Sequence, residues 1–233
     1  MKMGIQEQLT QQLDDVIHNV DQPSTMVQST TTEIDGRKIF YIYTKPTPDR
    51  CCTVILFHDQ INDSFVWSEI NTLQILAAYG YRSVALDLPL FGRSEGAGFE
   101  TQEERGTFVQ HFLDNIQQSN DEMFVLIGAS MAGQYLIPFL NHVADVKQRL
   151  IGFVGVALSD SHELNASIRL PSTLIIRGEL DSSIGIDASS AFKVFENVRH
   201  FVIPRGKHLA HLGNAELFNR VLVNFLNGLM KSP

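Results

Sequence analysis

Hydrophobic and polar positions recur with two different periods in the first part of the chain. Residues 4–20 carry apolar side chains at helical spacing on a polar background, which predicts an amphipathic helix. Residues 26–34 and 38–43 instead alternate on either side of Asp35-Gly36, the strongest short-range signal of a β-hairpin. We therefore expect an N-terminal extension over residues 1–24, followed by an antiparallel pair of strands.

From residue 51 onward, short apolar runs alternate with helical stripes. The runs favour strands that are buried on both faces: residues 51–57, 83–88, 124–127, 151–158, 172–177 and 199–203. Because strands that alternate with helices pair in parallel through crossovers, we predict a single α/β domain over residues 25–233. Its sheet should be mostly parallel and doubly wound, with helices on both faces.

Two of the helical stripes give sharper predictions. The apolar residues from Val66 to Ala77 predict one helix that Gly80 ends. Another helix is expected to begin near Met131, and Pro138 should bend that helix or end its first half early.

Composition narrows the class of protein. The chain has 233 residues, of which 44% are hydrophobic and 19% charged, so it can build a core and shows no sign of disorder. The formal net charge of -8 argues against a surface for nucleic acid or anionic membrane. No apolar run has the length of a signal peptide or a membrane span. The neighbours Cys51 and Cys52 are interpreted as reduced thiols, so we expect a soluble, intracellular protein.

The segment Met123–Gly133 combines an apolar strand pattern with a serine among small residues. Ser130 stands where the strand must turn into a helix, and Gly128 and Ala132 leave room for a sharp reversal. Such a turn, Gly-x-Ser-x-Gly with alanine in the last position, lifts a hydroxyl above the sheet and points the first helix amides at the same space. Ser130 is therefore the candidate nucleophile.

A serine nucleophile needs a histidine to accept its proton and an acid to orient that histidine. Asp181 and His208 each follow a predicted core strand, at the edge where the loops of parallel strands meet. Glu179 is an alternative acid, but its side chain should point to another face of the turn. His211 is an alternative base, but the loop after Gly206 is better suited to present His208. Serine, aspartate and histidine in this chain order are typical of an α/β-hydrolase.

The negative charge that develops during acyl transfer needs two backbone amides as donors. The amide of Met131 is one candidate, and the loop after the first core strand supplies the other, for which we choose Gln60. His58, in the same loop, is expected to order it. No His-x-x-x-His or similar spacing indicates a metal, and no cofactor is expected.

Three segments carry a resemblance to a known family. They are Leu56-Phe-His-Asp-Gln60, the stretch from Gly80 to Ser94, and Ser130-Met-Ala-Gly-Gln-Tyr135 with the following Leu136-Ile-Pro-Phe-Leu140. Together they resemble the α/β-hydrolase domain-containing protein 14 family, over a length from about Val27 to the C-terminus. The chain departs from the family pattern at Asp59, where the family has glycine, and at Leu90, where many relatives have glycine.

The resemblance implies an α/β-hydrolase fold and places the nucleophile on Ser130, the acid on Asp181 and the base on His208. It also implies a cytosolic and nuclear protein that hydrolyses small activated acyl esters. A transfer of acetyl groups from protein lysine to coenzyme A has been proposed for members of this family.

Two functional hypotheses follow. The first is a monomeric serine hydrolase or acyltransferase that acts on short acyl groups of small esters or acylated proteins, with water or coenzyme A as the acceptor. The link between residues 158 and 172 is too short for a lid of helices, so the crevice should be open and small, which disfavours long-chain lipids. The second hypothesis is a protein-interaction module with weak or no turnover, suggested by Asp59 and the N-terminal helix.

Overall fold

The computed structural model describes residues 25–46, 52–142 and 149–230. Its centre is an eight-stranded sheet in the order β1-β2-β4-β3-β5-β6-β7-β8. The strands are β1 (Gln28–Ile34), β2 (Arg37–Tyr43), β3 (Cys52–Phe57), β4 (Arg82–Leu86), β5 (Met123–Ala129), β6 (Leu150–Val156), β7 (Ser172–Gly178) and β8 (Val198–Ile203). The pairs β1–β2 and β2–β4 are antiparallel, and the remaining pairs are parallel. The predicted fold, with its N-terminal hairpin, is confirmed. The predicted helix at residues 4–20 lies outside the described residues.

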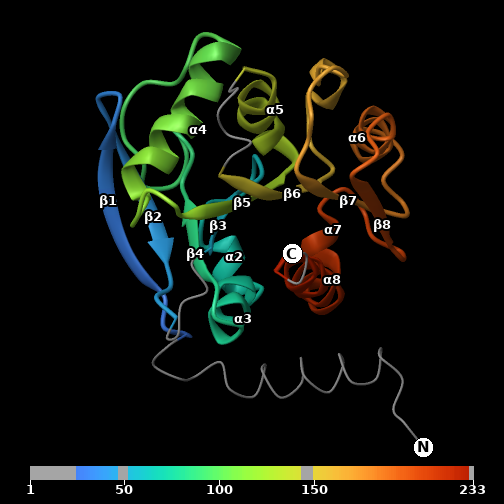
Figure 1. Ribbon diagram of the computed structural model, residues 1–233, viewed down its shortest axis with the longest axis horizontal. Coiled ribbons are helices and arrows are strands. Elements are labelled where there is room, and N and C mark those ends of the chain that lie inside the picture. The colour runs from blue at the N-terminus through green and yellow to red at the C-terminus, as the bar shows by residue number, and fades with distance from the viewer. Residues whose placement is uncertain (1–24, 47–51, 143–148, 231–233) are drawn as a thin grey trace, which may run out of the picture.

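Helices cover both faces of the sheet. They are α2 (Val66–Glu69), α3 (Thr72–Ala78), α4 (Gln102–Ile116), α5 (Gly133–His142), α6 (Ile184–Phe192), α7 (Ala210–Gly213) and α8 (Ala215–Leu229). Figure 1 shows α4, α5 and α6 on one side of the sheet and α2, α3 and α8 on the other. The molecule is therefore a three-layer sandwich, as expected for right-handed crossovers that pass on alternate faces.

The continuous apolar runs of the central strands build two cores. Every residue of β3 and β4 is buried. Along β3, Ile55 and Phe57 belong to the hydrophobic cluster under α4 and α5, whereas Val54 and Leu56 belong to the cluster under α3 and α8. Successive side chains of a strand point to opposite faces, so a strand between two helical layers is apolar at most positions.

The prediction of one helix from Val66 to Ala77 is wrong. The structure has two short helices, α2 and α3, separated at Asn71, whose backbone is left-handed with φ 59°. A single left-handed residue reverses the local helical sense and breaks the hydrogen-bond ladder. Gly80, with φ 83°, follows the end of α3 as predicted.

For the helix after Ser130, one of the two predicted effects of Pro138 is wrong. α5 contains Pro138 and continues to His142, so the proline does not end the helix early, while the predicted bend stays a prediction. Pro138 is buried against α4 at Gly106, where a side chain would approach the Phe139 nitrogen to 2.9 Å. Tertiary packing thus holds α5 together across the missing amide.

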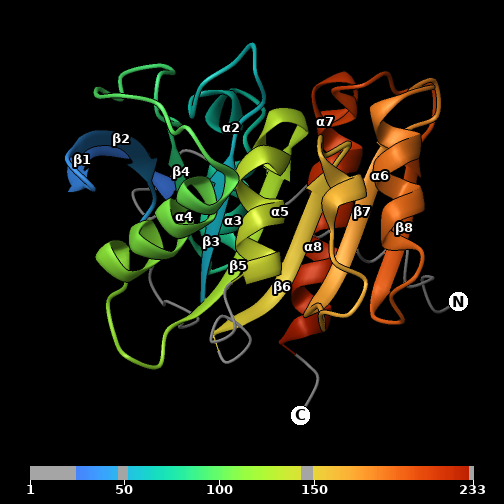
Figure 2. The ribbon, with the colours of Figure 1, turned by 90° about the horizontal axis from the view of Figure 1, so that it is seen from above.

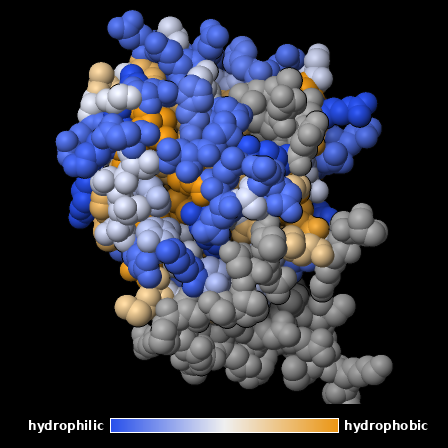
Figure 3. All heavy atoms as spheres, turned by 60° about the vertical axis from the view of Figure 1, so that its left-hand side comes forward, coloured by the Kyte–Doolittle hydropathy of each residue, from blue (hydrophilic) through white to orange (hydrophobic). Residues whose placement is uncertain are grey.

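The surface of the molecule is mainly polar. Figure 3 shows one side of it, where hydrophilic residues cover most of the described surface and hydrophobic residues appear in the gaps between them.

Within the described residues, none of the helices has the length and apolarity that crossing a membrane requires. Cys52 is buried in β3, and Cys51 lies outside the described residues. Between β6 and β7 the chain forms only a short 3-10 helix, Ser161–Glu163, and no lid.

Candidate active site

Ser130 lies at the sharp turn between β5 and α5. Its backbone is left-handed, with φ 48°, and a single 3-10 turn (Ser130–Ala132) leads into α5. A side chain on Gly128 would come within 2.3 Å of the Leu136 side chain and 2.9 Å of Ala132. The small residues around the serine are therefore required by the turn itself, as in the strained nucleophile elbow of α/β-hydrolases.

The turn is fixed from outside by the loop that follows β6. The amide of Ser159 donates a hydrogen bond of 2.9 Å to the carbonyl oxygen of Ser130. A side chain on Gly133 would lie 2.0 Å from the Ser159 carbonyl oxygen, so only glycine allows α5 to approach this loop so closely. The position of the Ser130 hydroxyl thus depends on two glycines and on one backbone hydrogen bond.

The structure brings the three predicted side chains together. The Nε2 atom of His208 lies 2.7 Å from the Ser130 hydroxyl oxygen, and its Nδ1 atom lies 2.9 Å from Oδ2 of Asp181. With a proton on Nδ1 that is donated to the carboxylate, Nε2 can accept the serine proton. The Asp181 side chain is only 2% exposed and that of His208 36%, so the acid is enclosed while the imidazole reaches solvent.

Asp181 is held as a carboxylate by its surroundings. Burial raises the pKa of Asp181, but the hydrogen bond from His208 and those from the amides of Ser183 and Gly185 more than offset this, so its pKa lies below the ordinary value. Gly185 also makes room for the carboxylate, because a side chain there would come within 2.6 Å of Oδ2. An ionised, well-oriented carboxylate stabilises the imidazolium that forms when serine is deprotonated.

Two glycines bring the Asp181 and His208 loops into contact. A side chain on Gly178 would approach the carbonyl oxygens of Gly206 and Lys207 to 2.3 and 2.2 Å. The amide of Leu180 donates a hydrogen bond of 2.8 Å to the Gly206 carbonyl oxygen. From the sequence, Gly206 could be interpreted only as part of a loop, whereas its close approach to Gly178 joins the two loops.

The alternative acid and base point elsewhere. The carboxylate of Glu179 accepts a hydrogen bond of 2.8 Å from the amide of Arg205, on the exposed surface. His211 is completely buried, and its ring stacks on Trp67 at a centroid distance of 5.1 Å. Geometry therefore favours Asp181 and His208 over these two alternatives.

The loop after β3 is tightly braced. His58 is buried; the Leu88 amide donates to its Nε2 atom at 2.9 Å, and its Nδ1 atom lies 2.6 Å from the Asp59 carbonyl oxygen. Burial lowers the pKa of His58, which is consistent with a neutral ring that orders the loop. Gln60 is exposed at the tip of the loop, and Met131 is buried beside the serine. The assignment of their amides to an oxyanion site stays a prediction.

Both carboxylate oxygens of Asp59 accept hydrogen bonds from residues of its own loop. Oδ1 accepts hydrogen bonds of 3.0 Å from the amide of Ile61 and from the side chain of Asn62, and Oδ2 accepts one of 2.8 Å from Asn62. Its backbone is not among the left-handed residues, so the position does not require glycine in this chain. The main structural reason to suspect a loss of turnover is thereby weakened.

Asp87 is a bracing residue that the sequence analysis did not assign. Its Oδ1 atom accepts from the Ser64 amide at 2.8 Å, and its Oδ2 atom accepts from the Arg93 amide at 2.7 Å. It thus connects the loops after β3 and β4. An aspartate directly after a core strand and before Pro89 and Gly92 was the available signal. Figure 2 shows these loops and α7 along the same edge of the sheet.

Comparison with known proteins assigns the chain to a family. It is 30% identical to mouse ABHD14A over 215 residues, which cover 89% of this chain and 83% of that protein. It is also 30% identical over 207 residues to human ABHD14B, whose name proposes protein-lysine deacylase activity; these cover 85% of this chain and 95% of that protein. The chain belongs to the ABHD14 family of α/β-hydrolases. No family model matches the sequence.

Solved structures agree with this fold. A CIB-like hydrolase of Thermoplasma acidophilum superposes with a TM-score of 0.75 at 22% identity, covering 87% of this chain and 99% of that one. The carboxylesterase CesB of Bacillus subtilis superposes with a TM-score of 0.71 at 15% identity, covering 95% and 98%. Among the described residues of the present chain, no cluster of His, Cys, Asp and Glu could hold a metal ion.

Proposed function

We propose that this member of the ABHD14 family is a serine hydrolase that cleaves short acyl groups from small esters or from acylated lysine, through an acyl-enzyme on Ser130. The observation that supports it best is the unbroken chain of hydrogen bonds from the Ser130 hydroxyl through His208 to the buried Asp181. Each of these residues comes from a different loop, and structural packing alone does not require a serine, an imidazole and a carboxylate in this order.

The distances allow the reaction to be written in steps. His208 Nε2 takes the proton of Ser130 as the serine oxygen attacks the carbonyl carbon, and the carbonyl oxygen becomes an oxyanion held by the Met131 and Gln60 amides. The imidazolium returns the proton to the leaving alcohol or amine as its bond to carbon breaks. Water, or the thiol of coenzyme A, then gives its proton to His208 and attacks the acyl carbon. The bond from that carbon to the Ser130 oxygen breaks, His208 returns the proton to this oxygen, and the acid or the acyl thioester leaves.

The absence of a lid supports short acyl groups. The 3-10 helix between β6 and β7 covers little, so a long acyl chain would remain largely in water instead of in a buried apolar tunnel. The size of the acyl group and the nature of the acceptor are parts of the proposal that the relatives do not supply.

The test begins with a fluorophosphonate probe. The wild-type protein should be labelled and Ser130→Ala should not, with Ser159→Ala as the control that retains labelling. p-Nitrophenyl esters from acetyl to decanoyl should then show rates that fall with chain length. Coenzyme A should yield an acyl thioester, detected by mass spectrometry, if transfer occurs. Labelling that is equal in Ser130→Ala, or absent from the wild type, would refute the proposed function.

A further inference from the structure

A pocket of about 440 Å³ adjoins the loop that carries Gln60. It lies between that loop, the helix α2 and the loop after β4, and we call it the flanking pocket. Ile61 and Leu90, exposed to 79% and 67%, stand at its mouth, and the acidic residues Asp63 and Glu69 are among the residues that line it. Gln60, whose backbone amide is the second candidate oxyanion donor, is among the residues that line the pocket.

Leu90 occupies its position against local preference. Its backbone is left-handed, with φ 74°, a conformation that leucine rarely adopts and that costs free energy. Burial of the side chain does not compensate, because two thirds of it is in water. Strain combined with an exposed apolar side chain is typical of residues that contact a ligand.

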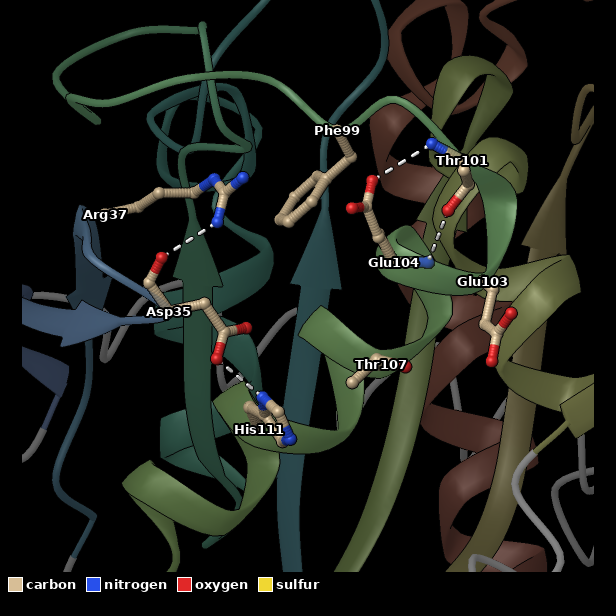
Figure 4. Close-up of a pocket in the computed structure, with 8 residues that line it drawn as sticks. All are labelled: Asp35, Arg37, Phe99, Thr101, Glu103, Glu104, Thr107 and His111. Carbon is tan, nitrogen blue, oxygen red and sulfur yellow. Dashed lines mark hydrogen bonds and ion pairs between the residues drawn. The ribbon is translucent and has the colours of Figure 1, made fainter.

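The side chain of Leu90 nevertheless packs against the loop that contains Gly98. Its Cδ1 atom lies only 2.8 Å from the place where a Cβ atom of Gly98 would be, so the glycine makes room for it. Arg37 holds this glycine by hydrogen bonds of 2.7 Å to the Ala97 carbonyl oxygen and 3.0 Å to that of Gly98. The Arg37 guanidinium also lies 4.0 Å from the centre of the Phe99 ring. Figure 4, a close-up of a different pocket, shows these two side chains next to each other. Leu90 therefore rests on a fixed loop.

The charge of the flanking pocket is negative. Among the described residues that line it there is no Lys, Arg or His. Arg93 approaches Asp63 to 3.8 Å and partly neutralises it. The carboxylate of Glu69 is exposed and has no hydrogen bond or ion pair with the described part of the chain. A cationic group entering the pocket would therefore find an acid that is available to pair with it.

We infer that the flanking pocket binds the polypeptide on one side of an acylated lysine, with an apolar residue against Ile61 and Leu90 and a Lys or Arg near Glu69. This inference deepens the proposed function and rests on it for the identity of the substrate. Charge complementarity and the shared residue Gln60 favour a cationic peptide over an uncharged acyl chain, which would gain nothing from the two carboxylates.

Binding can be measured without turnover in Ser130→Ala protein. The probe is a short fluorescein-labelled peptide with a central acetyl-lysine flanked by leucine and lysines, and its dissociation constant is read by fluorescence anisotropy. Glu69→Gln should weaken binding about two- to five-fold, as expected for one exposed ion pair, and high salt should remove the difference. Leu90→Ala should also weaken it, whereas Glu196→Gln, which removes an exposed charge before β8, should not.

A second pair of variants separates contact from strain. Leu90→Gly relieves the left-handed backbone as well as removing the side chain, so it should bind the peptide as weakly as Leu90→Ala while unfolding at higher denaturant concentration. The control Glu196→Gln, outside the pocket, should hydrolyse p-nitrophenyl acetate at the wild-type rate. That rate also reports separately on the proposed function, because an inactive wild type refutes the hydrolase and leaves the binding result standing.

Two results would overturn the inference. Equal peptide affinity in Ser130→Ala with and without Glu69→Gln and Leu90→Ala would exclude the flanking pocket as a peptide site. A loss confined to decanoyl ester hydrolysis in Leu90→Ala, with peptide binding unchanged, would assign the pocket to the acyl chain instead.

Discussion

Burial of His211 predicts that acid destabilises the protein through this single side chain. The ring is completely buried, stacks on Trp67 and meets Phe218 at a centroid distance of 5.8 Å. Neither ring nitrogen has a hydrogen-bond partner among the described residues. Burial lowers its pKa from 6.5 to about 4; Asp59 acts in the opposite direction and His208 in the same direction as burial. The folded state therefore holds a neutral imidazole where the unfolded chain would already bind a proton.

The size of the effect follows from the two pKa values. Above pH 6.5 the imidazole is neutral in both states and costs nothing. As the pH falls, the unfolded state binds the proton first, so the free energy of unfolding falls by at most ~1.4 kcal/mol per pH unit until the folded pKa is reached. With a folded pKa of about 4, the loss is about 2 kcal/mol at pH 5 and approaches ~3.4 kcal/mol below pH 4.

The variant His211→Phe keeps a planar ring against Trp67 and cannot titrate. Urea unfolding at pH 7, 6 and 5, followed by circular dichroism, should show that the variant loses about 2 kcal/mol less stability than the wild type between pH 7 and pH 5. His58, whose pKa burial also lowers, contributes equally to both proteins and cancels in the difference. An equal loss in His211→Phe and in wild type would refute this reasoning.

Two further substitutions test the elbow and the loop after β3. Gly133→Ala places a Cβ atom 2.0 Å from the Ser159 carbonyl oxygen, so it should destabilise the fold by about 1–3 kcal/mol and reduce fluorophosphonate labelling. Gly228→Ala, in α8, meets no atom within 4 Å and should stabilise by up to about 1 kcal/mol, so the opposite signs in urea unfolding form a matched control. Asp59→Gly removes the carboxylate that holds the loop carrying Gln60, and ester hydrolysis should fall about tenfold, or ~1.4 kcal/mol. A rate that rises in Asp59→Gly would show instead that the aspartate impairs turnover.

The buried strands and the approach of the three site residues could be predicted from the sequence, but the contacts that make this approach close could not. Buried strands were predictable because a strand between two helical layers is apolar at most positions. The approach of Ser130, Asp181 and His208 could be expected because the carboxyl ends of parallel strands lie along one edge. The contacts that make this approach close are backbone contacts at Gly178 and Gly206, and the sequence does not show which backbone lies opposite a glycine.

Left-handed residues could be predicted from the sequence at some positions and not at others. At Ser130 the surrounding small residues predicted the sharp turn. At Asn71 the residue type permits the conformation, but the helical pattern on both sides gave no reason to expect it. At Leu90 the residue type argues against the conformation, so its preference must have been overridden by contacts between other residues.

Those contacts can be identified in the loop after β4. The carboxylate of Asp87 accepts from the Arg93 amide at 2.7 Å, and the hydroxyl of Ser94 donates to the Asp87 carbonyl oxygen at 2.6 Å. The amide of Phe91 donates to the Leu88 carbonyl oxygen at 2.9 Å. With both ends of the loop tied to one aspartate, the chain must reverse within a few residues, and Leu90 stands where it reverses. The strain at the mouth of the flanking pocket is therefore imposed by the same carboxylate that joins this loop to the loop after β3.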